Sequence, residues 1–358
     1  MRVWIDSLTP KHALFFEPLS RNLRRQGHDL LITTRKYREA EQTLRLRKLP
    51  FSIVGEHGGG TRYGKLLASG SRIVRLAGLV EEWHPDTSVS FSSPEAARVA
   101  FGLGVPHVSA NDSPHSWQVA RLSIPLSRYV CSPWIIPRQV WLAFGAWNDG
   151  VFRYKALDAA AWIKRHKPDP AILRQLGLDL DRPIIVLRTE ESFATYLEGK
   201  ASDQRPVILP IIDRILRLKL DIQLVVSTRY GEQAPTLKRR FGGKIQVLDR
   251  IVDTTSLLSY STMFIGSGGT MTVEAALLGK PAISCFPGTR TLYMEYLEKK
   301  RLMKTIHSPS RIAREVSQII GSPDEALEQG QRGKRLVRWM EDPIATVERA
   351  LKKTVAAA

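Results

Sequence analysis

The stretch FIGSGGTMTVEAALLGKP, residues 264–281, joins an apolar strand to a helix through a run of small residues. Gly266, Gly268 and Gly269 permit the positive φ angles and the sharp turn that such a direct connection needs. The helix expected to begin at Thr270 presents amide groups without an intrahelical acceptor, together with the positive end of its dipole. A helix tip of this kind binds phosphate, and the hydroxyls of Ser267 and Thr270 add donors. The stretch therefore predicts a phosphate site late in the chain.

Glu274 is a carboxylate about one turn inside the same helix. It would repel phosphate, but a carboxylate accepts two O–H bonds and so suits a neutral diol such as a ribose. Phosphate at the tip and a sugar one turn along describe a nucleoside diphosphate. The stretch is neither a Walker A loop, since no Gly-Lys-Ser/Thr follows, nor the dinucleotide fingerprint, which follows a first strand. The alternative is a glycine-rich turn with a glutamate that is solvated or merely favoured near the N-terminus of a helix.

Short apolar runs alternate with amphipathic stretches of helical spacing through most of the chain. The first set of expected strands covers residues 3–6, 29–34, 51–54, 87–91, 107–110 and 128–132. The second set covers residues 184–189, 222–228, 245–249, 262–266 and 282–286. Alternation of this kind is typical of parallel sheets covered by helices on both faces.

A proline-containing, charged connection, KRHKPDPAILRQLGLDLDRP at 164–183, separates the two sets. We therefore expect an α/β protein with two doubly wound, Rossmann-like domains that face each other across a cleft. The predicted divisions are an N-terminal domain over 1–165, a second domain over 166–325 and a helical tail over 326–358. Ligands of such sheets bind beyond the carboxyl ends of the strands.

The composition is that of a soluble globular protein, with 43% hydrophobic and 25% charged residues among 358. The formal charge of +18 favours anionic partners such as phosphorylated ligands, nucleic acid or acidic lipids. Cys131 and Cys285 lie in apolar surroundings and are expected to be buried thiols. We expect no metal and no cofactor, because no ligand spacing typical of zinc occurs. No signal peptide and no apolar run of membrane-spanning length is present, so the expected compartment is the cytoplasm.

The longer segment FIGSGGTMTVEAALLGKPAISCFPG, residues 264–288, resembles the nucleotide-sugar site of the GT-B superfamily. It is most similar to the Ser-Gly-Gly…Glu-Glu-Ala…Gly-Lys-Pro segment of UDP-N-acetylglucosamine 2-epimerases and to the glycine-rich segment of MurG-type glycosyltransferases. From residue 1 to about 320 the chain resembles a family of proteins of unknown function that are often described as predicted glycosyltransferases. The resemblance implies a GT-B-like fold with an N-terminal acceptor domain and a C-terminal nucleotide-sugar domain.

Two further segments of the second domain take part in this resemblance. The first is IIVLRTEESFATY at 184–196, which is similar to the start of that domain in the superfamily. There an arginine after the first strand reaches the diphosphate, and the corresponding residue here is Arg188. The alternative is that Arg188 forms a surface ion pair with Glu190 or Glu191. VLDRIVDTTSLLSYS at 247–261 resembles the segment whose backbone reads the base. The donor-binding residues implied are Arg188, Arg250, Ile251, Gly266, Ser267, Gly268, Gly269, Thr270 and Glu274.

In the first domain, IDSLTPKHALFFEPL at 5–19 resembles the opening strand and loop of the transferases, although SLTPK replaces the usual glycine-rich loop. His12 is the candidate general base there, or alternatively a capping or surface histidine. In VPHVSANDSPHSWQVARLSIPLSRYV at 105–130, Ala-Asn-Asp stands where the epimerases carry His-Val-Glu-Ala-Gly, which favours the transferase reading. Asn111 becomes an acceptor contact, and Asp112 and His115 become catalytic candidates; a helix-capping turn is the alternative.

The favoured function is sugar transfer from a nucleoside diphosphate sugar, a UDP-sugar by resemblance, to an acceptor hydroxyl. No Asp-x-Asp motif occurs in a suitable loop, so we expect a metal-independent reaction in which the helix dipole, amides and Arg188 stabilise the leaving diphosphate. Proton transfer to His12 or Asp112 implies direct displacement with inversion. One alternative is a UDP-sugar 2-epimerase on the same fold. Another is a non-enzymatic basic module that binds RNA or an anionic membrane.

Two features favour an anionic membrane surface and a lipid-linked acceptor, and hence peripheral attachment of the cytoplasmic protein. The segment SPWIIPRQVWLAFGAW, residues 132–147, interleaves three tryptophans with apolar residues and an arginine; its alternative is an apolar loop that packs in the cleft, or a homodimer contact. No nucleic-acid-binding motif is present, and we expect no nucleic-acid partner. The basic residues around the second strand are Arg24, Arg25, Arg35, Lys36, Arg38, Arg45, Arg47 and Lys48.

Overall fold

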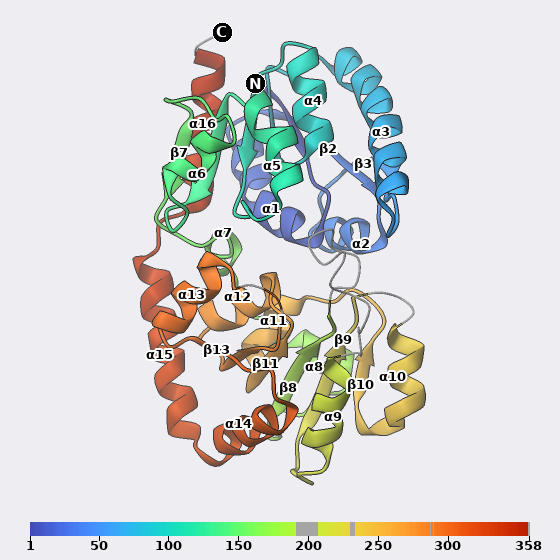
Figure 1. Ribbon diagram of the computed structural model, residues 1–358, viewed down its shortest axis with the longest axis vertical. Helices are drawn as coiled ribbons and strands as arrows, with labels where there is room; N and C mark the ends of the chain where they lie inside the picture. Colours follow the sequence, from blue (N-terminus) through green and yellow to red (C-terminus); the bar gives the residue numbers. More distant parts are fainter. Residues whose placement is uncertain (191–206, 230–232, 287, 289, 357–358) are drawn as a thin grey trace. The chain divides into compact units, whose positions relative to one another are not determined.

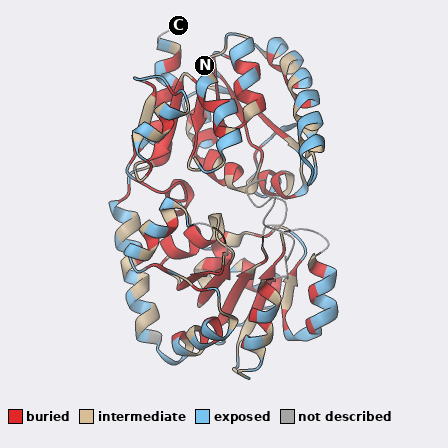
Figure 2. Cartoon of the chain, viewed as in Figure 1, coloured by how far each residue is buried: buried red, intermediate tan, exposed pale blue. Residues whose placement is uncertain are grey.

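The structure is a computed structural model that describes residues 1–190, 207–229, 233–286, 288 and 290–356 (Figure 1). The chain forms two compact units. Unit 1 comprises residues 1–162 together with 340–358, and unit 2 comprises residues 163–339. Each unit is built around one parallel sheet, and the strands of both sheets are buried (Figure 2). The prediction of two doubly wound α/β domains is confirmed.

Unit 1 contains a seven-stranded parallel sheet with the order β3-β2-β1-β4-β5-β6-β7. The order reverses direction between β1 and β4, and the carboxyl ends of these two neighbouring strands therefore form a topological switch point. The strands are β1 (Arg2–Asp6), β2 (Asp29–Lys36), β3 (Ser52–Glu56), β4 (Thr87–Phe91), β5 (His107–Ala110), β6 (Tyr129–Pro133) and β7 (Val151–Tyr154).

Helices cover the sheet of unit 1 because their apolar stripes match its buried faces. On one face Trp4 of β1 packs with Leu76 and Val80 of α3 and with Val99 of α4. The helices are α1 (Pro10–Arg25), α2 (Arg38–Leu46), α3 (Arg62–Trp83), α4 (Pro94–Gly102), α5 (Trp117–Ser123), α6 (Arg138–Ala143) and α16 (Pro343–Ala356); α7 (Ala160–Ile163) runs to the boundary with unit 2.

Unit 2 repeats the architecture with the strand order β10-β9-β8-β11-β12-β13, again all parallel. Its switch point lies between β8 and β11, where Arg188 is in register with Gly266. The strands are β8 (Ile184–Arg188), β9 (Gln223–Ser227), β10 (Gln246–Leu248), β11 (Met263–Gly266), β12 (Ala282–Ser284) and β13 (Met303–Thr305).

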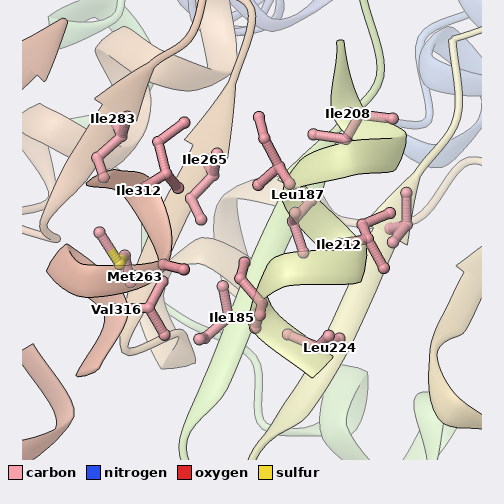
Figure 3. Packing of buried hydrophobic residues seen from close by; sticks show 14 of the residues in the cluster. Ile185, Leu187, Ile208, Ile212, Leu224, Met263, Ile265, Ile283, Ile312 and Val316 are labelled. Carbon is pink, nitrogen blue, oxygen red and sulfur yellow. The ribbon is translucent and has the colours of Figure 1, made fainter. Parts of the chain in front are cut away.

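The core of unit 2 forms where two helices pack on one face of this sheet (Figure 3). Ile208 and Ile212 of α9 and Ile312 of α14 meet the strand residues Ile185 and Ile265. The helices are α8 (Ala171–Leu176), α9 (Ile208–Leu216), α10 (Gln233–Phe241), α11 (Thr254–Tyr260), α12 (Thr270–Leu277), α13 (Leu292–Lys299), α14 (Pro309–Gly321) and α15 (Pro323–Trp339).

The glycine of the Gly-Lys-Pro segment has a packing role. Gly279 ends α12 with a φ of +76°, and a Cβ built there would lie 2.6 Å from the backbone of Gly330. A Cβ on Gly333 would in turn lie 2.5 Å from Gly279 Cα. These glycines let α15 contact the end of α12 directly, which fixes the helix that carries Glu274.

The chain divides differently from the predicted boundaries of 1–165, 166–325 and 326–358, because the last two helices belong to different units. Helix α15 packs on α12 in unit 2, whereas α16 returns to unit 1 and covers β4 to β7. Ile344, Val347 and Leu351 are buried in that contact, and the Thr354 hydroxyl donates to Thr87 Oγ1 at 2.7 Å. An amphipathic helix must bury its apolar stripe, but sequence spacing does not say against which sheet.

Two strands of the structure were not expected from the sequence, β7 and β13. Both are short and lie at sheet edges, and their burial is uneven. Such segments lack both a continuous apolar run and a clear alternation, so only pairing with β6 and β12 reveals them.

Candidate functional site

The carboxyl ends of β8 and β11 bring two predicted donor-binding residues together in unit 2. Arg188 ends β8 and pairs with Gly266 at the end of β11, which in turn pairs with Ser284 of β12. The loop of Ser267, Gly268 and Gly269 then leads directly into α12. This is the place where doubly wound sheets bind ligands.

The tip of α12 is an open, donor-rich helix start. Gly268 and Gly269 have φ angles of +81° and +85°. Gly269 is the N-cap, and residues other than glycine avoid its combination of this φ with a ψ of −166°. Among the residues that the structure describes, no side chain caps the helix. A Cβ on Gly269 would find no atom of these residues within 4 Å, so they leave space in front of the first turn. Ser267 and Thr270 are partly exposed at this edge.

The Arg188 side chain is anchored toward β9. Its Nη1 donates to Ser227 Oγ at 2.5 Å and to the Thr228 carbonyl at 2.9 Å. These bonds hold the guanidinium at the carboxyl edge of the sheet, beside the switch point. Of the alternative partners named from the sequence, Glu191 lies outside the described residues.

Glu274 is almost completely buried, with 1% of its surface exposed, and faces α11. Its Oε1 accepts a hydrogen bond from the Thr255 hydroxyl at 2.9 Å. The carboxylate thus couples α12 to α11, in addition to any contact with a ligand. Arg250 is exposed and Ile251 partly exposed on the loop after β10, which β9 separates from β8 at the same sheet edge.

In unit 1 a lysine joins two carboxylates from distant loops. Lys11 Nζ lies 2.5 Å from Asp112 Oδ2 and 2.7 Å from Asp158 Oδ2, and 4.2 Å from the centre of the Phe91 ring. Lys11 sits in the first turn of α1, Asp112 follows β5, and Asp158 follows β7. The group therefore lies at the carboxyl edge of the sheet, next to the switch point of β1 and β4.

The two carboxylates of this group have opposite protonation tendencies. Burial raises the pKa of Asp112, but the Lys11 charge outweighs it and holds that pKa below its ordinary value. Burial and the neighbouring Asp112 raise the pKa of Asp158, whose Oδ1 accepts a hydrogen bond from the Tyr154 hydroxyl. Asp112 is also the more exposed of the two, with 16% of its side chain accessible against 4%. An ionised carboxylate and a proton-holding one thus share a single cation.

The remaining predicted residues of unit 1 surround this group. His12 stacks on Phe91 and accepts the Leu8 amide hydrogen at Nδ1, 3.1 Å away, which places its proton on Nε2. Burial and the Lys11 charge lower the pKa of His12 to about 3, so it is neutral and weakly basic. The charges of Asp112 and Lys11 also act on His115, whose pKa burial lowers. Asn111 is buried, and its Nδ2 has no hydrogen-bond partner among the described residues.

Sequence reasoning missed Lys11, Tyr154 and Asp158. Lys11 belongs to the SLTPK segment that departs from the glycine-rich pattern, and its position beside His12 was a usable signal. Asp158 lies in RYKALDAAAW, which resembles no motif, and 147 residues separate it from Lys11. Only the parallel arrangement of β1, β5 and β7 brings the three loops together.

Buried neutral histidines make the stability of unit 1 depend on pH. Both nitrogens of His107 contact serine hydroxyls of β4, and burial lowers its pKa to about 4. His107 takes up a proton near pH 6.5 in the unfolded chain but only near pH 4 in the folded chain. The free energy of unfolding therefore falls as the pH drops through this window. Each unit of pKa depression corresponds to about 1.4 kcal/mol.

Urea unfolding should therefore show a smaller pH dependence for His107→Gln, whereas the exposed His84→Gln should leave it unchanged; equal curves for both variants would contradict this.

The tryptophan segment of residues 132–147 packs largely within unit 1. Trp141 is completely buried in a small core with Ile124, Val130 and Ile136, whereas Trp147 is 57% exposed. Most of the segment is therefore occupied by packing. Among the described residues, no helix has both the length and the apolar surface needed to cross a bilayer, and no three acidic, histidine or cysteine side chains gather as metal ligands would.

Two parallel-sheet units of this topology, each with polar groups at its switch point, define the GT-B fold class, and solved structures agree. The chain is similar to UDP-GlcNAc 2-epimerase from Neisseria meningitidis, solved with bound UDP-GlcNAc, at 16% identity and a TM-score of 0.74 over 100% of both chains. It is also similar to the spinosyn forosaminyltransferase SpnP, at 17% identity and a TM-score of 0.64 over 99% of both chains. The predicted GT-B-like fold is confirmed.

The chain itself belongs to the family described as "Protein of unknown function (DUF354)", which it matches over residues 1–354. A curated relative, "Uncharacterized protein MJ0665" from Methanocaldococcus jannaschii, is 29% identical over 346 residues, which are 95% of both chains. The family match thus covers both units and the returning helix α16.

Proposed function

We propose that the protein transfers a sugar from a UDP-sugar to an acceptor hydroxyl, with the donor bound in unit 2. The observation that carries this proposal is the open tip of α12 at the β8–β11 switch point. An uncapped helix start preceded by two positive-φ glycines binds the diphosphate of a nucleotide through its amides and dipole. The UDP-GlcNAc bound by the Neisseria meningitidis epimerase supports the choice of a UDP-sugar.

The remaining donor contacts follow from the position of this tip. Arg188 at the end of β8 stabilises the charge that develops on the leaving diphosphate. A ribose hydroxyl contacts the Glu274 carboxylate, which also accepts from Thr255. The backbone at Arg250 and Ile251 contacts the base.

The unit 1 group supplies the base of the reaction. The acceptor oxygen forms a bond to the anomeric carbon of the sugar, and the bond from that carbon to the diphosphate oxygen breaks. The hydroxyl proton passes to Asp112, the more exposed carboxylate, and UDP leaves. We place this proton on Asp112 rather than His12, because both ring nitrogens of His12 are engaged: Nδ1 accepts the Leu8 amide hydrogen and Nε2 already carries a proton. Lys11 and Asp158 position Asp112, Asn111 Nδ2 donates to the acceptor, and His115 borders the same space.

A UDP-sugar 2-epimerase is the second candidate. It is favoured by the greater structural similarity to the Neisseria meningitidis epimerase than to SpnP. The two reactions differ in what happens at carbon 2 of the sugar. Turnover in deuterated water would place deuterium at carbon 2 in an epimerase, whereas a transferase leaves that carbon unlabelled.

The donor site is tested by ligand binding. Among UDP-, GDP-, TDP- and CDP-sugars, we expect UDP-sugars to raise the melting temperature, because a ligand of the folded state stabilises it. Gly269→Asp adds a side chain and a negative charge in front of α12, and should weaken UDP binding by about tenfold or more in calorimetry. Gly177→Asp is the matched control, since Gly177 also has positive φ and open space but caps α8. No UDP binding by the unchanged protein, or equal binding by both variants, would sink the proposal.

A further inference from the structure

A second group of polar residues in unit 1 lies at the carboxyl ends of β2 and β3, and centres on Arg35. The pairing of β2 with β3 shifts register between Thr34 and Lys36, where Arg35 of β2 stands opposite two residues of β3, Val54 and Gly55. Bulges of this kind redirect a side chain and are frequent beside functional sites.

The Arg35 guanidinium lacks a polar partner. It makes no hydrogen bond and no ion pair with any residue that the structure describes, and its Nε is completely buried. Its ring contact is with Tyr37, whose centre lies 5.9 Å from Cζ. The acid that acts on it most strongly, Glu95, already lies 4.0 Å from Arg72. A buried donor without an acceptor is costly, and it calls for an explanation such as a ligand.

Other donors lie around the same point. His57, after β3, stacks on Tyr37 with ring centres 5.2 Å apart, and its Nδ1 accepts the Gly59 amide hydrogen at 3.1 Å. This leaves the proton on Nε2, which is a donor. Burial together with the charges of Arg35 and Lys65 lowers the pKa of His57 to about 4. Both cations therefore act on one neutral, donating imidazole.

We propose that Arg35, His57 and Lys65 bind a phosphate group at the ends of β2 and β3 in unit 1. A guanidinium fork suits phosphate oxygens, and the absence of a carboxylate paired with Arg35 favours a doubly charged anion over a singly charged one. This site carries the Arg35 charge, which also acts on His12 beside Lys11. In the transfer reaction it would hold the phosphate of a phosphorylated acceptor; that role rests on the proposed function, whereas the phosphate site does not.

The site is tested by titrating pyrophosphate into the full-length protein in the presence of saturating UDP, with calorimetry as the readout. We expect one pyrophosphate per chain, and about tenfold or greater loss of affinity in Arg35→Met. Arg24→Met is the matched control: it removes the same charge from an exposed position at the last turn of α1 and should bind as the unchanged protein does.

Thermal unfolding separates a binding role from a structural one. Because Nε of Arg35 is buried and has no partner among the described residues, Arg35→Met should unfold at the same temperature or higher in the absence of ligand, and Arg35→Lys should bind with intermediate affinity. The proposal is overturned if pyrophosphate does not bind, or if Arg35→Met and Arg24→Met bind it equally. Failure of UDP to bind would instead overturn the donor site, while pyrophosphate binding that depends on Arg35 would still be measured.

Discussion

Replacing Asp6 with asparagine is expected to lower the free energy of unfolding by about 3 to 5 kcal/mol, the cost of leaving a buried charge alone. Asp6 is fully buried at the end of β1, and its Oδ1 lies 2.5 Å from Nη2 of Arg72, which is itself 1% exposed. Thr33 and Ser93 donate to the same carboxylate at 2.6 and 2.7 Å. The asparagine would leave the Arg72 guanidinium with only the more distant carboxylate of Glu95, 4.0 Å away, as a counter-charge.

Chemical denaturation measures this effect against a matched exposed pair. Asp149→Asn breaks the surface pair with Arg128 in the same unit and should leave the unfolding midpoint nearly unchanged. Asp6→Leu combined with Arg72→Met should cost less than Asp6→Asn alone, because neither charge then remains unpaired. Single variants at Asp6 that unfold like Asp149→Asn would show that the pair does not stabilise unit 1.

The same pair gives a pH dependence with a defined sign. Burial raises the pKa of Asp6, but the Arg72 charge and three hydrogen-bonding side chains outweigh it and hold the pKa below 3.8. The folded chain therefore releases this proton more readily than the unfolded chain. Its contribution to stability is present above about pH 4 and disappears as the pH falls through the folded value, so the difference between the unchanged protein and Asp6→Asn should shrink in acid.

The second large effect concerns catalysis. Asp112→Asn should lower kcat for turnover of the UDP-sugar found in the binding screen by about 10²- to 10⁴-fold, the usual contribution of a general base. The dissociation constant for UDP should not change, because the proposed donor residues all belong to unit 2. Asp149→Asn serves again as control and should keep full activity.

The pH–rate profile identifies the part that Lys11 plays. Its charge lowers the pKa of Asp112, so Lys11→Met should move the acidic limb of the profile to higher pH, and Lys11→Arg should restore it. A lysine that only supports the fold would lower activity without moving the limb. Retention of kcat within about twofold in Asp112→Asn would exclude this carboxylate as the base.

Several candidate residues were accessible from the sequence because local rules govern them. Apolar runs separated by amphipathic stretches specify parallel strands and their covering helices, and a glycine-rich turn after β11 must precede a helix start. The placement of Arg188 and Gly266 at neighbouring strand ends follows from the same rules, since parallel strands bring their carboxyl ends to one edge. The roles of these residues stay predictions until ligand binding is measured.

Other features depend on contacts between residues far apart in the chain. The sequence places His12 and Asp112 on loops after β1 and β5, but not the cation between Asp112 and Asp158 that alters their proton affinities. Nor does it indicate that Thr255 would occupy an oxygen of Glu274, or that Arg35 would lack a partner. Desolvation and charge pairing act through space, so the chemistry of each group is set by neighbours that the sequence alone does not identify.

By itself, then, the sequence determined the two parallel α/β sheets and the glycine-led start of α12, because hydrophobic period and backbone freedom are properties of short segments. Tertiary structure alone decided that α16 completes unit 1, that Asp6 pairs with Arg72 across 66 residues, and that Lys11 joins two carboxylates. The position of α16 depends on which sheet buries its apolar face, and the two charge pairings depend on which charged groups are removed from water. Both are properties of the folded chain and not of short segments.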